Sequence, residues 1–82
     1  MIDPILSDLF SRMDAAEHRY GAFASPHEAL GVALEEWHEF IDAIRANDDA
    51  AAVYEAVDLA AVLIRFAVQY GAYNKRSPLT GA

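Results

Sequence analysis

The chain has 82 residues, enough for one small domain, and a domain of this size buries only about 60% of the surface that its unfolded chain exposes. The absence of cysteine excludes disulfides and thiolate metal sites, so a carboxylate or histidine metal site and self-association are the remaining means of stabilisation. Hydrophobic residues make up 55% of the sequence, and we interpret this excess as apolar surface that another copy of the chain covers.

Thirteen acidic residues face six basic ones, which gives a net charge of −7. Nine of the acids lie between Glu28 and Asp58, where Arg45 is the single base. This acidic centre argues against nucleic acid and against an anionic membrane as partners, because both bind basic surfaces. It suits cations instead, including a nucleotide that already carries Mg²⁺.

The first residues and the most apolar segment indicate where in the cell the protein is expected. Residues 1–4 show no basic region followed by an apolar stretch, which argues against a signal peptide. Residues 59–70 form the most apolar segment, but it is too short and too charged to span a bilayer. We therefore expect a cytoplasmic location.

Two similar start signals, Asp3-Pro4 and Ser25-Pro26, precede the first two expected helices. In each, a short polar side chain can accept hydrogen bonds from free N–H groups, and proline takes a first-turn position that needs no donor. Glu28 follows Ser25 by three residues and completes a capping box. The sequence predicts a first helix over 4–20, ended by Gly21.

The second helix is predicted over 26–46 and the third over 49–70. Asn47 can adopt the left-handed conformation that ends a helix, and Asp48 or Asp49 can cap the next one. No segment alternates with period two, so we expect a single all-α domain of three helices. The short turn at Asn47 and Asp48 predicts that the second and third helices are antiparallel. Residues 72–82 are predicted to form an irregular tail.

Five carboxylates form two groups, one on each of these helices. The second helix carries Glu35, Glu36 and Glu39, and the third carries Glu55 and Asp58. Residues three or four apart are neighbours on a helix surface, so these acids form like-charged pairs, which are mildly destabilising. Some other interaction should offset that repulsion.

The two helices differ in what surrounds their acids. On the second helix, a core stripe is predicted at Leu30, Leu34, Trp37, Ile41 and Ile44. The three glutamates lie roughly opposite that stripe, where a solvated face and a metal site explain them about equally well. The third helix is apolar nearly all round, which is typical of a buried helix. Its Glu55 and Asp58 should therefore be partly buried, and buried charges need partners or a metal.

The spacing of these acids resembles a motif in which ExxE and ExxD lie on two antiparallel helices. The chain reads Glu36-Trp37-His38-Glu39, then fifteen residues, then Glu55-Ala56-Val57-Asp58. Leu34-Glu35 precedes the first pair, and an apolar helical stretch follows the second. Over residues 25–70 the pattern is similar to that of the MazG-like all-α nucleoside triphosphate pyrophosphohydrolases.

The resemblance implies hydrolysis between the α and β phosphates of a nucleoside triphosphate, giving a monophosphate and pyrophosphate. It implies Glu36, Glu39, Glu55 and Asp58 as ligands of Mg²⁺, with Mn²⁺ as an alternative ion. Glu35 would be an accessory acid that positions water, so the candidate catalytic residues are Glu35, Glu36 and Glu39. It also implies a homodimer or a dimer of dimers.

Many members of that family continue past the third helix with Lys, Asn and Arg residues that contact phosphates. Here the candidates for substrate binding are Asn74, Lys75 and Arg76, on the tail. Aromatic residues that flank the expected loops could line a base pocket, although core or interface packing is the simpler interpretation: Tyr20, Phe23, Tyr70 and Tyr73. No residue pattern selects a base or a sugar.

Two other interpretations stay open. The chain could be a non-catalytic helical module that oligomerises, or that binds nucleotide or metal as a decayed family member. Glu35-x-x-His38 also matches half of a di-iron carboxylate site, but such bundles use a second Glu-x-x-His, which Glu55-x-x-Asp58 does not supply.

Overall fold

The computed structural model of the chain describes residues 1–71, which form three helices: α1 (Asp3–Tyr20), α2 (Pro26–Arg45) and α3 (Asp49–Gly71). Residues 1–71 contain no strand, so the prediction of an all-α fold with three helices is confirmed. Each helix boundary lies within one residue of its predicted position. The tail predicted over 72–82 lies outside the described residues. None of these three helices combines the length and apolar character needed to cross a membrane.

Side-chain caps begin α2 and α3 as the sequence predicts. The Ser25 hydroxyl accepts the backbone N–H of Glu28 at 3.1 Å, and the Glu28 carboxylate accepts the N–H of Ala24 at 3.2 Å. The Asp48 carboxylate accepts the N–H of Ala51 at 3.0 Å. These contacts satisfy N–H groups that have no partner within the first turn of a helix.

The start of α1 differs from the prediction, because Asp3 is its first helical residue and not its cap. Ile2 occupies the cap position and provides no side-chain hydrogen bond. The helix ends are as predicted. Gly21, with a φ of 71°, follows α1, and Asn47, with a φ of 57°, lies in the turn after α2. A positive φ at these points lets the chain leave the helix.

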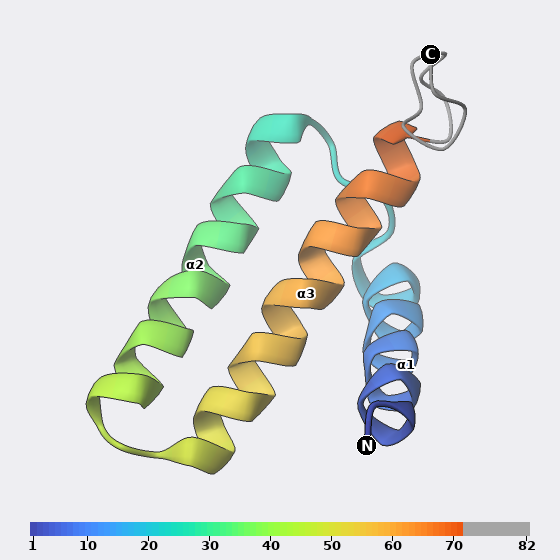
Figure 1. Cartoon of the computed structure of the whole chain (residues 1–82). Helices are drawn as coiled ribbons and strands as arrows, with labels where there is room; N and C mark the ends of the chain where they lie inside the picture. Colours follow the sequence, from blue (N-terminus) through green and yellow to red (C-terminus); the bar gives the residue numbers. More distant parts are fainter. Residues whose placement is uncertain (72–82) are drawn as a thin grey trace.

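Helix α3 lies in the middle of the molecule, with α1 on one side and α2 on the other (Figure 1). The chain reverses direction after Asn47, so α3 runs back beside α2 (Figure 1). The core has two small parts. Leu9 of α1 packs on Val57 and Ala61 of α3, and the second part consists of Phe23, Ala29 and Val62.

The side of α2 that packs on α3 is not the predicted one. Ala29 and Ala43 are buried, and Ile41 of the predicted core stripe is partly buried. The other four large residues of that stripe are about half exposed, at 45–56%: Leu30, Leu34, Trp37 and Ile44. Small side chains let two helices approach closely, which explains why the alanine side is preferred. Glu36 follows Ala29 by seven residues and Ala43 follows Glu36 by seven, so Glu36 lies on the packed side.

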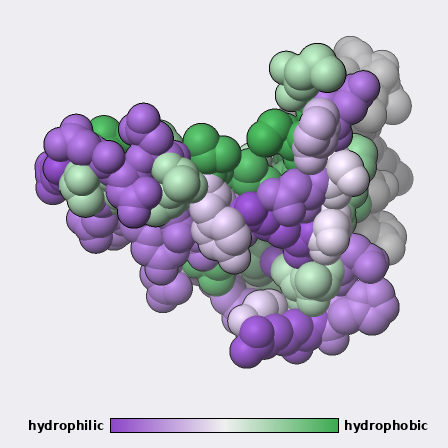
Figure 2. Space-filling model, turned by 90° about the horizontal axis from the view of Figure 1, so that it is seen from below, coloured by the Kyte–Doolittle hydropathy of each residue, from purple (hydrophilic) through white to green (hydrophobic). Residues whose placement is uncertain are grey.

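The large side chains that α2 leaves exposed belong to a wider apolar surface. Seen from below, hydrophobic side chains gather in the hollow at the upper edge of the molecule, beside the largely hydrophilic lobe at the left (Figure 2). Leu30 of α2 and Leu63 of α3 line one shallow apolar groove of about 170 Å³. The surface therefore continues from α2 onto α3.

Two neighbouring residues of α1 test the packing. Leu9 is 6% exposed and Phe10 is 60% exposed. Leu9→Ala should lower the free energy of unfolding by about 2–5 kcal/mol, because it removes buried contacts and leaves a cavity. Phe10→Ala, the matched control, should change it by about 0.5 kcal/mol or less. Urea unfolding followed by circular dichroism measures both, and equal effects would show that this packing is wrong.

Candidate functional site

Three glutamates from the two packed helices converge. Glu36 and Glu39 come from α2, one turn apart, and Glu55 comes from the first half of α3. One carboxylate oxygen from each lies within 4.8 Å of the others. Glu36 and Glu55 are half-buried and Glu39 is exposed, so the group is open to solvent on one side. Three of the four predicted metal ligands are thus brought together.

Two oxygens of this group lack a hydrogen-bond partner. Glu36 Oε2 and Glu55 Oε2 are buried and accept no hydrogen bond within residues 1–71. Burial raises the pKa of Glu36 from 4.5 to about 8, and the nearby charges of Glu39 and Asp58 contribute to that rise. Burial also raises the pKa of Glu55, with a further contribution from Glu39. Burial and mutual repulsion therefore disfavour the charged forms of Glu36 and Glu55 when they have no partner.

The fourth predicted ligand, Asp58, is bound to an arginine of α1. Its Oδ1 accepts a hydrogen bond from Arg12 Nη1 at 2.9 Å. Arg12 also donates to Asp8 and to the backbone oxygen of Tyr54, both at 2.7 Å, and lies 3.9 Å from the centre of the Tyr54 ring. Sequence reasoning missed Arg12, although it follows the core residue Leu9 by three and therefore lies near the packed side of α1.

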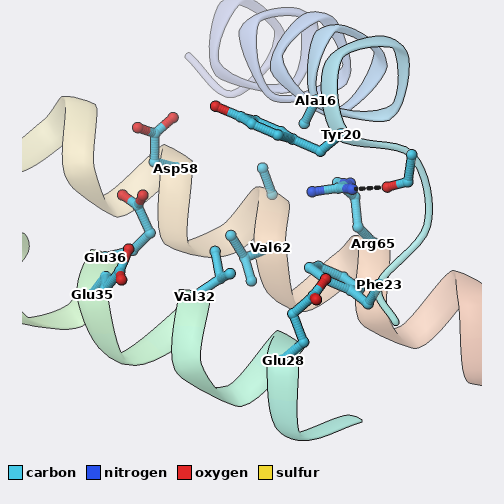
Figure 3. A pocket seen from close by; sticks show the side chains of 12 residues that line it. Ala16, Tyr20, Phe23, Glu28, Val32, Glu35, Glu36, Asp58, Val62 and Arg65 are labelled. Atoms are coloured by element: carbon cyan, nitrogen blue, oxygen red, sulfur yellow. Dashed lines mark hydrogen bonds between the residues drawn. The ribbon is translucent and has the colours of Figure 1, made fainter. Parts of the chain in front are cut away.

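A cavity of about 370 Å³ adjoins the glutamates, between α1 and α2 and above α3 (Figure 3). Glu35, Glu36 and Asp58 lie at one end of it, and the side chains of Val32 and Val62 form apolar walls. Its size is within the range of small-molecule sites, roughly 300–1,000 Å³, which combine apolar walls with a few polar groups. The exposed Glu35 is thus next to the metal centre predicted for Glu36.

Arg65 occupies the other end of the cavity and is only 6% exposed. Its Nε donates to Glu17 at 2.8 Å and its Nη2 to the backbone oxygen of Gly21 at 2.9 Å. Its guanidinium also lies 4.6 Å from the centre of the Phe23 ring. These contacts fix the side chain and join α3 to the end of α1. Sequence reasoning assigned Arg65 no role.

The remaining predictions concern the tail, His38 and the aromatic residues. Asn74, Lys75 and Arg76, the predicted substrate-binding residues, lie outside the described residues. His38 is exposed, and the acidic group found within residues 1–71 contains glutamates alone. That composition gives no support to the di-iron interpretation. Tyr20 and Phe23, named from the sequence as possible base contacts, both line the cavity.

Comparisons with family models, with curated proteins and with solved structures find no match for this chain. The similarity to MazG-like enzymes thus remains a prediction from the spacing of the acids. The geometry of the three glutamates and of the cavity provides the independent basis for what the site can do.

The raised pKa of Glu36 predicts how stability depends on pH in EDTA. Between pH 4.5 and about 8 the folded state holds a proton that the unfolded state releases, so rising pH favours unfolding. The free energy of unfolding of wild type should fall across this range. Glu36→Gln should remove most of the fall, whereas Glu35→Gln, the exposed control, should keep it. Urea titrations at several pH values measure the slopes, and equal slopes for wild type and Glu36→Gln would contradict the prediction.

Proposed function

We propose that the protein is a Mg²⁺-dependent nucleoside triphosphate pyrophosphohydrolase of the MazG-like kind, acting in the cytoplasm. It would release the monophosphate and pyrophosphate. One observation carries the proposal: Glu36, Glu39 and Glu55 converge from two helices beside a cavity of about 370 Å³, and one buried oxygen each of Glu36 and Glu55 has no hydrogen-bond partner within residues 1–71. The ExxE and ExxD pairs on α2 and α3 add the resemblance in sequence.

The donor set fits Mg²⁺. This ion binds hard oxygen ligands, keeps several waters, and is usually held by one or two carboxylates together with substrate phosphates. Glu36, Glu39 and Glu55 provide carboxylate oxygens alone, and two of these oxygens have no other partner in the described chain. Mn²⁺ accepts the same ligands. Asp58 would join them by exchanging its hydrogen bond with Arg12 for the ion.

The chemistry needs few groups beyond the ion, since phosphoryl transfer depends mainly on positioning and charge neutralisation. Mg²⁺, when bound, neutralises phosphate charge and orients the phosphates. Glu35, exposed at the acidic end of the cavity, would orient a water molecule and take up its proton. The water oxygen would bond to the α or the β phosphorus, and the bond from that same phosphorus to the oxygen bridging the two would break. The monophosphate and pyrophosphate would then separate, with the bridging oxygen kept by the phosphate that was not attacked.

We also propose that a second copy covers the apolar surface shared by α2 and α3, giving a homodimer or a dimer of dimers with antiparallel α2 and α3 in each protomer. Its members are Leu30, Leu34, Trp37, Ile44, Val53, Leu63 and Ile64, which are 37–56% exposed. Together they expose on the order of 600 Å², at the upper end of what monomers leave open and near the ~800 Å² that each partner of a standard interface buries.

This surface and the cavity lie on different sides of the contact between α2 and α3. Val32 and Glu36 line the cavity, whereas Leu30 and Ala33 line the apolar groove, and Ala29 lies between the two sets around the helix. A dimer formed through the apolar surface would therefore leave the acidic site of each protomer open to substrate.

Glu39→Gln tests the hydrolase proposal, because it keeps the shape of the side chain and removes one charge. Wild type should be stabilised by Mg²⁺, by about 2.7 kcal/mol at a hundred times the dissociation constant, and should release pyrophosphate from nucleoside triphosphates. In EDTA the variant should melt no lower than wild type. It should lose most of the stabilisation by Mg²⁺ and should release no pyrophosphate. Melting curves and a pyrophosphate assay measure this.

The matched control is Asp42→Asn, which changes an exposed acid of α2 outside the acidic group. It should respond to Mg²⁺ and release pyrophosphate as wild type does. If Glu39→Gln and Asp42→Asn both respond like wild type, the acids merely face solvent. The non-catalytic helical module would then be the better interpretation.

Leu34→Lys tests the proposed dimer, because it places a charge in the apolar surface. Wild type should sediment as a dimer or larger at micromolar concentration, and Leu34→Lys should shift it to the monomer. Ser11→Lys, at an exposed position of α1, should leave the assembly unchanged. A wild type that sediments as a stable monomer would rule out the dimer.

A further inference from the structure

We infer that the Arg65 end of the cavity binds the base of the nucleotide and prefers a base with a carbonyl group where adenine carries its amino group. Hypoxanthine and guanine are such bases. The inference names the substrate class of the site proposed above, and rests on that proposal for the position of the phosphates.

The two ends of the cavity carry different groups: Glu35, Glu36 and Asp58 line one end, whereas Arg65 lines the other, with the Glu28 carboxylate nearby (Figure 3). Glu55 and Arg65 are ten residues apart on α3, which separates their backbones by roughly 15 Å at about 1.5 Å per residue. The cavity lies along this stretch, from Asp58 to Arg65. Phosphates held through a cation at the glutamates would direct the nucleoside along the cavity toward Arg65.

Arg65 is suited to a neutral acceptor more than to a phosphate. Its charge is already compensated by Glu17, whose carboxylate accepts from Nε at 2.8 Å. With Nη2 bound to the Gly21 oxygen, Nη1 has no hydrogen-bond partner among residues 1–71. The guanidinium points into the cavity (Figure 3). A fixed, nearly buried donor of this kind selects ligands that present an acceptor.

A carbonyl oxygen at C6 of a purine provides that acceptor, whereas the amino group of adenine is itself a donor. An adenine in the same position would leave the Arg65 donor and its own amino group facing each other unpaired. Sites built around a buried hydrogen-bonding group discriminate against ligands that fail to match it. The base preference follows from this one contact.

The walls of the cavity fit a flat ring. Tyr20 lies over the cavity and is 70% exposed, so its ring can adjust to a base beneath it (Figure 3). Val62 lies on the opposite side (Figure 3), and Phe23 packs against the guanidinium of Arg65. Bases stack on aromatic side chains whatever their hydrogen-bonding groups, so Tyr20 contributes affinity and Arg65 contributes selectivity.

The test uses inosine and adenosine monophosphates, which have a carbonyl and an amino group at C6, respectively. Calorimetry with the full chain and Mg²⁺ should show that inosine monophosphate binds about tenfold more tightly, the effect of one hydrogen bond. Arg65→Lys, which keeps the charge and changes the geometry, should bring the two affinities together. Equal affinities in wild type, or no binding of either nucleotide, would overturn the inference.

Arg65 also joins α1 to α3, so a second variant avoids the risk of misfolding. Tyr20→Ala should weaken both monophosphates about tenfold and alike, because one stacking contact is lost. Phe10→Ala, which removes an exposed aromatic ring of α1 outside the cavity, should bind both nucleotides as wild type does. If Tyr20→Ala binds both nucleotides as tightly as wild type, this cavity is not the base site.

Pyrophosphate release from inosine and adenosine triphosphates separates this inference from the hydrolase proposal. Equal release from both would support the hydrolase and contradict the base preference. Preferred binding of inosine monophosphate without hydrolysis of any triphosphate would support the base site and contradict the hydrolase.

Discussion

Alanine side chains let α2 and α3 lie against each other, and this close contact determines the environment of the acids. Ala29 and Ala43 of α2 and Ala52 of α3 are buried. Because Ala29 and Ala43 share a side of α2 with Glu36, packing these two alanines on α3 turns that carboxylate toward α3 and the acids there. A pairing through the larger residues of α2 would have left Glu36 in solvent. The unpaired oxygens and the raised pKa of Glu36 follow from this packing.

Two arginine–carboxylate contacts attach α1 to the same central helix. Arg12 of α1 binds Asp58 of α3, and Arg65 of α3 binds Glu17 of α1, at 2.9 and 2.8 Å. Because the apolar contact between α1 and α3 is small, these polar contacts are important for the position of α1. They also place the Arg12 guanidinium beside the acidic group and the Arg65 guanidinium at the far end of the cavity, where α1 forms part of the wall.

The proposed nucleotide site depends on the different groups along the cavity. Its acidic end would suit a divalent cation with phosphates and its apolar middle a sugar and a ring, and its other end holds the Arg65 donor with the Glu28 carboxylate nearby. The large exposed side chains of α2, such as Trp37, lie away from the cavity, so association with another copy is compatible with an open site.

The sequence by itself determined the helices and the pairing of the acids along each of them. Helix ends depend on residues close in sequence: the cap at Ser25, a cap at Asp48 or Asp49, the stop at Gly21 and the left-handed Asn47 were predicted, and the structure has the second cap at Asp48. Such contacts span three or four residues, and they form wherever the local chain allows them. The three-residue spacing within each acidic pair is equally local.

The tertiary structure alone decided which side of α2 packs and which groups meet across the molecule. Periodicity marks both the alanine side and the larger apolar side of α2 as hydrophobic, and the choice depends on how closely α3 can approach. The contact of Arg12 with Asp58 spans 46 residues and that of Arg65 with Glu17 spans 48. No local pattern specifies such pairs, because they form only when the packed helices bring distant residues together.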